Sequence, residues 1–313
     1  PAARRCAVFL STLMFAGILF AVTACLVWGL GFAAPLFAPE FTPAQLSAAR
    51  FIVFGGFSAA LCLRWRPPPL RHPLWRQAVL GSVSGNLLYY LCLVGGIRLI
   101  GVPLPTLIVG MLPVTLALAA NLRGGELRWA RLWPSLALIG AGLLAVNADA
   151  LARLPANGLG DFALGVGLAL MALAFWTWFG LMNARLLRAG ALSASVWSAM
   201  LGAAVLPFAL ALAAWAFSQP WPQVSADAWL RLAAVALVTG VIGGWWASWL
   251  WSQASVRLPV TLAGQLIVVE TLAGIAYGQL YTWQWPDWPL LLGGALMVAG
   301  VVWALSAARG VGH

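Results

Sequence analysis

The chain has 313 residues, of which 63% are hydrophobic and 8% are charged. Soluble globular domains carry roughly 25% charged residues, so this composition excludes an ordinary soluble protein and indicates a membrane protein with several spans. All 17 basic residues are arginine, and we attribute the formal net charge of +10 to one face of a membrane rather than to nucleic-acid binding.

Ten apolar segments follow one another along the chain, separated by charges and by Gly/Pro clusters. Their length and their lack of strict alternation predict helices rather than barrel strands, because in lipid every backbone amide needs an internal partner. The first run continues to Phe37, too long for the apolar part of a signal peptide, so we expect a membrane helix there. We place the spans at 15–37, 43–63, 74–96, 102–121, 131–148, 160–184, 191–217, 229–251, 259–280 and 288–306.

Most arginines fall on one side of the membrane when the N-terminus is placed in the cytoplasm. Thirteen then lie on the inner side, whereas the outer side holds only Arg98, Arg153 and Arg231 together with most of the acidic residues. The inner set is Arg4, Arg5, Arg64, Arg66, Arg71, Arg76, Arg123, Arg128, Arg131, Arg185, Arg188, Arg257 and Arg309. This asymmetry predicts a multi-pass protein of the bacterial inner (plasma) membrane with both termini in the cytoplasm.

The two halves of the chain resemble each other. "MLPVTLALA" (111–119) aligns with "VETLAGIAY" (269–277), and "ACLVWGLGF" (24–32) aligns with "ALAFWTWFG" (172–180). Each half contains five spans, an odd number, so the second half is expected to be inverted in the membrane. The sequence therefore predicts an all-α membrane domain of ten helices in two inverted repeats, residues 1–150 and 151–313, an architecture typical of secondary transporters.

A polar set lies in the middle of the third span. Asn86 and Tyr90 are four residues apart and share one helical face, with Tyr89 beside them. We expect that face to line a cavity. Arg50 lies about two turns into the second span, and we favour a bracing or snorkelling role for it.

Glu270 is the only charged residue in the apolar run from 258 to 285. A carboxylate at the centre of a bilayer costs roughly 2.5–3.5 kcal/mol, so it should be protonated, paired or exposed to a wet cavity. Two interpretations remain open: a protonated side chain that braces a neighbouring helix, or a cavity acid that meets a substrate ammonium group or exchanges a proton. Gln265, five residues earlier, is a secondary candidate.

Six stretches resemble the EamA-type branch of the drug/metabolite transporter superfamily, and the last three of them are similar to its bacterial aromatic amino-acid exporters. The stretches are "VWG" (27–29), "AARFIVFGG" (48–56), "LPVTLALAANLRGGELRW" (112–129), "YLCLVGGIRLIGV" (90–102), "FWTWFGLMNARLLR" (175–188) and "TGVIGGWWASWLWSQASV" (239–256). The sequence departs from the family pattern at Thr271, where a proline is common, and at Gln284, where an acid is usual. Both departures bear on the substrate rather than on the fold.

The resemblance implies a basket of helices around a central cavity, with Tyr90 and Trp176 in the pocket and Pro113 at a break in the fourth span. Pro113 also removes a backbone hydrogen bond, which favours a bend there. Four tryptophans are candidates for walls that stack apolar or aromatic substrates: Trp176, Trp178, Trp245 and Trp246.

The sequence contains no Walker A motif and no cluster of metal ligands or nucleophiles, so we expect no ATP-driven pump, no enzyme, no cofactor and no metal site. We expect a secondary transporter that exports amino acids, aromatic ones included, by alternating access. The alternatives are an exporter of drugs, sugars or nucleotide-linked metabolites and, more distantly, a membrane-embedded enzyme or receptor. The expected partners are a small-molecule substrate and the lipid bilayer, with no nucleic acid, and the sequence does not indicate an oligomeric state.

Overall fold

The computed structural model describes residues 2–100, 103–122, 129–148, 159–218, 224–283 and 285–309, and within these ranges the secondary structure is helical with no strand. Eight helices are long and apolar enough to cross a membrane, and two shorter apolar helices lie at Leu112–Leu122 and Leu132–Val146. The prediction of an all-α protein with several spans is confirmed. Several residues used above lie outside the described ranges: Arg123, Arg128, Arg153 and Gln284.

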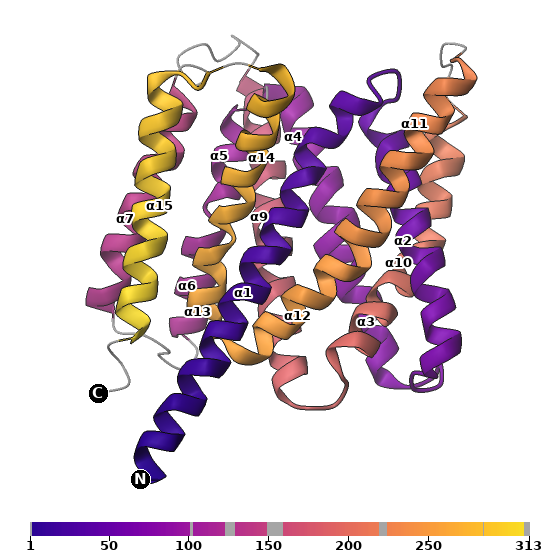
Figure 1. The fold of residues 1–313 in the computed structure, drawn as a ribbon. Helices are drawn as coiled ribbons and strands as arrows, with labels where there is room; N and C mark the ends of the chain where they lie inside the picture. Colours follow the sequence, from indigo (N-terminus) through magenta and orange to yellow (C-terminus); the bar gives the residue numbers. More distant parts are fainter. Residues whose placement is uncertain are drawn as a thin grey trace.

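The helices stand side by side as a bundle (Figure 1). In chain order they are α1 (Ala2–Phe37), α2 (Pro43–Trp65), α3 (Pro73–Ser82), η1 (Val83–Leu88), α4 (Tyr89–Ile100), α5 (Pro103–Gly110), α6 (Leu112–Leu122), α7 (Trp129–Val146), α9 (Leu159–Arg188), α10 (Ala194–Ala216), α11 (Ala226–Leu237), η2 (Val238–Trp246), α12 (Ala247–Arg257), α13 (Val260–Leu266), α14 (Val268–Thr282) and α15 (Trp288–Arg309). Four of the expected spans are interrupted, at η1, at η2, between α5 and α6, and between α13 and α14. The sequence predicted only the third of these interruptions.

Capping residues mark the first turns of several helices. At α2, Thr42 accepts a hydrogen bond from the amide of Gln45 (3.3 Å), while the Gln45 side chain accepts one from the amide of Thr42 (2.9 Å), and Pro43 occupies the first turn. At α10 and α11, the hydroxyl groups of Ser193 and Ser225 likewise accept a hydrogen bond from the amide three residues further on. Such caps satisfy amide groups that the first helical turn leaves without partners.

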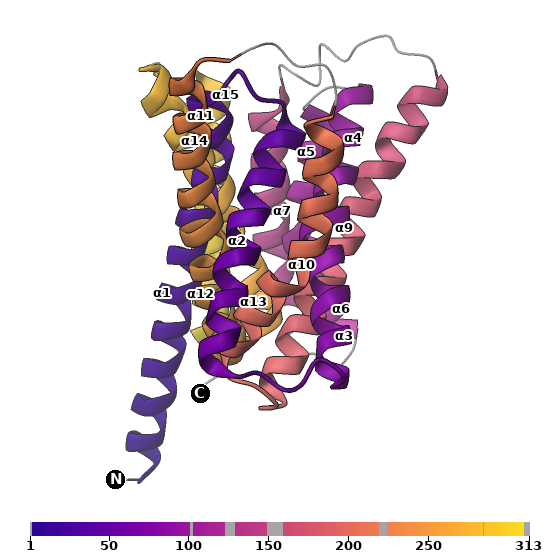
Figure 2. The ribbon, with the colours of Figure 1, turned by 90° about the vertical axis from the view of Figure 1, so that its right-hand side faces the viewer.

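The long helices pair across the two halves of the chain. α2 packs along α10, and the two stand next to each other in Figure 2. α7 packs along α15, α1 along α14 and α12, and α4 along α9. The helices that pair most extensively therefore come from opposite halves of the sequence.

Two facing glycines bring α7 and α15 together. A Cβ atom built on Gly142 would lie 2.6 Å from the carbonyl oxygen of Gly293, and one built on Gly293 would lie 2.6 Å from that of Gly142. Backbones come this close only where side chains are absent, the usual basis of close helix packing in membranes.

An ion pair at one end of the bundle joins the α1–α2 connection to α11. The guanidinium of Arg231 donates a hydrogen bond to the carboxylate of Glu40. A backbone hydrogen bond and this arginine hold the pKa of Glu40 below its ordinary value. Both side chains are partly exposed, so we expect the pair to add little to stability.

At the opposite end of the bundle, from which α1 begins in Figure 1, α6, α9 and α13 pack closely against one another. There the side chain of Leu116 on α6 fits between α9 and α13, and a Cβ atom on either Gly180 or Gly264 would lie 3.0 Å from it. Arg188 at the end of α9 donates hydrogen bonds to the backbone carbonyls of Ser255 and Leu258. These contacts separate the middle of the bundle from this end.

We expect Gly142→Ala to lower the stability of the purified protein, because the added methyl group would overlap the backbone of α15. Overpacking of this kind costs about 1–3 kcal/mol, which should appear as a lower melting temperature in detergent. Gly140→Ala is the matched control, since a Cβ atom there has open space around it. Equal melting temperatures for the two variants would contradict the close contact between α7 and α15.

Candidate substrate cavity

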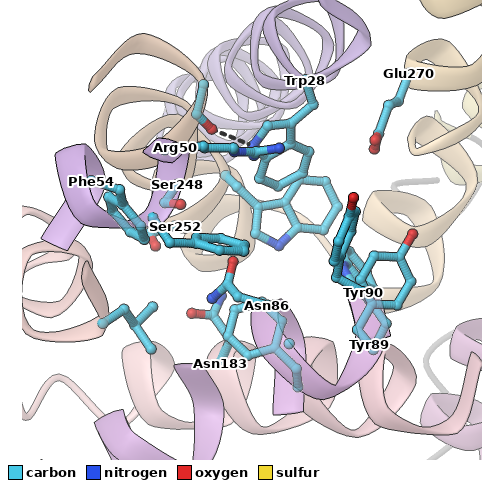
Figure 3. A pocket seen from close by; sticks show the side chains of 18 of the residues that line it. Trp28, Arg50, Phe54, Asn86, Tyr89, Tyr90, Asn183, Ser248, Ser252 and Glu270 are labelled. Carbon is cyan, nitrogen blue, oxygen red and sulfur yellow. Dashed lines mark hydrogen bonds between the residues drawn. The ribbon is translucent and has the colours of Figure 1, made fainter. Parts of the chain in front are cut away.

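A cavity of about 130 Å³ lies in the middle of the bundle. Its walls come from α1, α2, η1, α4, α6, α9, α10, η2, α12 and α14, so both halves of the chain contribute. The polar side chains that line it are Arg50, Asn86, Tyr89, Tyr90, Asn183, Ser248, Ser252 and Glu270. Figure 3 shows these side chains converging from different helices.

Two π-helical segments border the cavity. η1 contributes Gly85 and Asn86, and η2 contributes Gly243 and Gly244. A π-helix inserts an extra residue into a helical turn and is found most often at functional sites. The indole nitrogen of Trp28 on α1 donates a hydrogen bond of 3.0 Å to the carbonyl of Gly243, drawn as a dashed line in Figure 3. An irregular segment of one half of the chain is thereby fixed to the first helix of the other.

Two helix breaks lie beside the same cavity. Around Met111 and around Ile267, backbone hydrogen bonds join residues three apart instead of four. The amide of Met111 donates to the carbonyl of Ile108 (3.1 Å), and the amide of Ile267 donates to that of Gly264 (3.2 Å). The amide of Glu270 in turn bonds to the carbonyl of Ile267 (2.9 Å). Glu270 therefore lies in the first turn after a break, and its side chain reaches the cavity.

Two opposite charges line the cavity without forming an ion pair. Arg50 comes from α2 and Glu270 from α14, and within the described ranges no contact of 4.0 Å or less joins their charged groups. The Nε atom of Arg50 is buried and has no hydrogen-bond partner among the described residues. The guanidinium carbon lies 5.6 Å from the centre of the Phe51 ring, within reach of a cation–π interaction.

Aromatic rings form one wall. Trp28 lies 5.5 Å from Trp251 and 6.4 Å from Trp176 between ring centroids, and Trp176 lies 5.9 Å from Trp251. The arrangement is tilted or edge-to-face, as aromatic pairs prefer. The cavity thus combines a broad apolar surface with two unpaired charges, the combination expected for an amphiphilic ligand.

A second cavity of about 90 Å³ adjoins the first. Tyr89, Leu112 and Glu270 line both, so the two cavities meet at these residues. The remaining walls of the second cavity are mainly apolar, and Pro113 is among them.

The structure brings together four of the side chains that the sequence proposed, since Asn86, Tyr90, Trp176 and Glu270 all line the main cavity. Tyr90 is also tied to the start of α2, because its hydroxyl donates a hydrogen bond of 2.9 Å to the carbonyl of Pro43.

Other candidates lie elsewhere. Gln265 is 1% exposed and accepts a hydrogen bond of 2.7 Å from the hydroxyl of Ser135, away from both cavities. Trp246 is 38% exposed and does not line either cavity. Trp178 borders an open groove formed with α3, and Trp245 packs against Phe57.

Sequence reasoning missed several residues of the cavity. Trp28 and Arg50 reach it from α1 and α2, and Asn183 reaches it from α9. Ser248 and Ser252 also line it, and their spacing of four residues within a span was a signal that could have identified them.

No group of three or more His, Cys, Asp or Glu side chains in the described ranges is placed to hold a metal ion.

Comparison with known proteins gives a partial match in sequence and a full-length match in fold. No family model matches the chain. The inner membrane protein YtfF of Escherichia coli (strain K12) is 39% identical over 184 residues, which are 56% of this chain and 57% of YtfF, so the match spans little more than half of that relative. A crystal structure described only as that of a protein superposes with a TM-score of 0.73 at 23% identity, covering 94% of this chain and 98% of its own. Because the identity is low, this second match shows a shared fold alone.

We expect Trp28→Phe to loosen η2, because phenylalanine keeps an aromatic ring but loses the hydrogen bond to Gly243. Leaving a buried acceptor without its partner costs about 1–3 kcal/mol. Hydrogen–deuterium exchange of peptides covering residues 238–246 should accelerate, and the melting temperature should fall. Trp133→Phe, at a position 71% exposed, is the matched control. Unchanged exchange in η2 would show that this bond does not hold the segment.

Proposed function

We propose that the chain is a secondary transporter of the bacterial inner membrane that exports amino acids, aromatic ones among them, and related small metabolites. The main support is the cavity in the middle of the bundle, where Arg50 and Glu270 face a wall of tryptophans. An amino acid offers charges of both signs and, when aromatic, an apolar ring. Glu270 would meet the ammonium group, and Asn86 and Tyr90 would contact other polar groups of the substrate.

Alternating access between two inverted five-helix repeats is the proposed mechanism. The irregular elements support it, because they recur in order in each half: η1 and then the α5–α6 break in the first, η2 and then the α13–α14 break in the second. Helix pairing supports it as well, since α2 pairs with α10 and α7 with α15. The ten spans would then comprise the eight long helices, the α5–α6 segment and α7.

The proposed location and orientation have separate support. YtfF is named an inner membrane protein, and the arginine distribution favours cytoplasmic termini. In Figure 1, α1 begins and α15 ends toward the same end of the bundle. The sequence stretches that resemble the EamA-type drug/metabolite transporters support assignment to that superfamily.

Counterflow into liposomes tests this function. Purified protein reconstituted with an internal amino acid should accumulate labelled amino acid from outside, and a panel of amino acids, sugars, nucleotides and drugs added as competitors should identify the cargo. Empty liposomes and protein-containing liposomes without internal substrate are the controls. Absence of counterflow for every amino acid would contradict the proposal, and competition by sugars or nucleotides alone would assign a different cargo.

A second experiment tests Glu270 as the coupling residue. Transport by the wild-type protein should respond to an imposed pH gradient if this carboxylate binds and releases a proton during the cycle, and Glu270→Gln should remove that response because glutamine binds no proton at neutral pH. Glu40→Gln is the matched control, since Glu40 lies outside both cavities. Intact flux with an unchanged pH profile in Glu270→Gln would leave Glu270 a structural role.

A further inference from the structure

The two unpaired charges of the main cavity lie on either side of one ring. A Cβ atom on Gly29 would lie 3.2 Å from the backbone oxygen of Glu270, and one on Gly31 would lie 3.6 Å from Nη1 of Arg50. At about 100° per residue, positions 29 and 31 fall on opposite sides of residue 28 in helical projection. The Trp28 side chain therefore projects between the two charges, as Figure 3 shows.

Neither group forms an ion pair or a side-chain hydrogen bond with a described residue. Nε of Arg50 has no hydrogen-bond partner among the described residues, and the Glu270 carboxylate accepts no hydrogen bond from a described side chain. Although the two charges act on each other electrostatically, they do not meet. Buried charges are costly unless something pairs them, and in a transporter the substrate can be that partner.

We propose that the two cavities together bind one zwitterionic amino acid in a fixed orientation, with its carboxylate on Arg50, its ammonium group on Glu270 and an apolar side chain in the second cavity. The inference rests on the proposed function and adds to it the role of Arg50 and the place of the side chain. The arginine acts as a carboxylate-binding residue rather than as a brace.

The chemistry of Arg50 fits this role. A guanidinium presents Nε–H and Nη–H groups in a planar fork that matches the two oxygens of a carboxylate. The free Nε of Arg50 leaves one edge of that fork available. A lysine would supply the charge without the fork, so Arg50→Lys should bind a carboxylate less well.

The second cavity fits an apolar side chain. It opens beside Glu270, where the ammonium group and the α-carbon next to it would lie. Its other walls include Leu93, Val109 and Leu143. Apolar walls favour apolar groups, and a polar side chain placed there would lose its hydration without replacement.

The test compares three ligands that differ only in their charged groups: phenylalanine, phenethylamine, which lacks the carboxylate, and 3-phenylpropanoate, which lacks the ammonium group. Each competes with labelled phenylalanine in counterflow. For the wild-type protein we expect phenylalanine to compete at least about ten-fold better than either analogue, as expected for the loss of one charged hydrogen-bonded contact.

The variants should respond in opposite directions. In Arg50→Gln, the preference for phenylalanine over phenethylamine should fall to within about three-fold, while the preference over 3-phenylpropanoate persists. In Glu270→Gln, the preference over 3-phenylpropanoate should fall and the preference over phenethylamine should persist. Arg71→Gln, in the exposed connection between α2 and α3, is the matched control and should keep both preferences. If a variant does not transport, ligand binding is measured instead by the increase in melting temperature of the purified protein. The increases given by the three ligands should follow the same order of preference.

A third variant addresses the side chain. Val109→Trp should fill the second cavity and lower competition by phenylalanine relative to alanine by at least about five-fold, because the indole would occupy the space proposed for the phenyl ring. Val302→Trp on α15, at a position 58% exposed, is the control.

The outcomes separate this inference from the proposed function. Amino-acid transport with equal competition by all three ligands, or with ratios that Arg50→Gln leaves unchanged, would overturn the assignment of Arg50 while the transport function stands. Unchanged selectivity in Val109→Trp would overturn the side-chain position. Failure of every amino acid in counterflow would instead overturn the proposed function itself.

Discussion

The structure depends on one constraint: in hydrocarbon, each backbone amide and carbonyl must find a partner within the protein. Regular helices meet this requirement everywhere, whereas irregular backbone is tolerated only where protein or a wet cavity surrounds it. In this chain η1, η2 and the residues after the α13–α14 break line the central cavity. The indole of Trp28 bonds to one carbonyl in η2, which supplies a partner where the helical pattern is disturbed. The irregular backbone and the central cavity therefore occur at the same place for the same physical reason.

The distribution of charge follows from the same constraint. Most arginines lie near helix ends or in connections, where water or headgroups solvate them. Arg50 and Glu270 are exceptions, since both sit within the bundle and face the cavity. An arginine that only braced helices would be expected to bond to carbonyls, as Arg188 does with Ser255 and Leu258. Arg50 instead leaves Nε without a partner, which is the difference that makes a ligand-binding role the better explanation.

Much of the fold and part of the site follow from the sequence alone. Apolar segment lengths predicted the helices and most of their bounds, because a span in lipid has few alternatives to a helix. The pair Asn86 and Tyr90 could be assigned to one face by spacing, and both line the cavity. The direction of a side chain was harder to predict: the depth of Arg50 in the membrane followed from its position in the span, but the side to which it points did not. Gln265 could not be placed, because its partner Ser135 lies far away in the chain. The extra residue in a π-helical turn changes the helical phase locally, so the position of Trp246 could not be read from a regular period.

Different contacts hold the cavity helices at the two ends of the bundle. At the end where α1 begins, Leu116 packs against Gly180 and Gly264, and Arg188 bridges to the α12–α13 connection. At the other end, the hydroxyl groups of Tyr277 and Tyr281 on α14 donate hydrogen bonds to α1 carbonyls. Contacts of both kinds can break without disrupting a helix. The helix breaks at Met111 and Ile267 lie within their spans, where bending could exchange one set of contacts for the other.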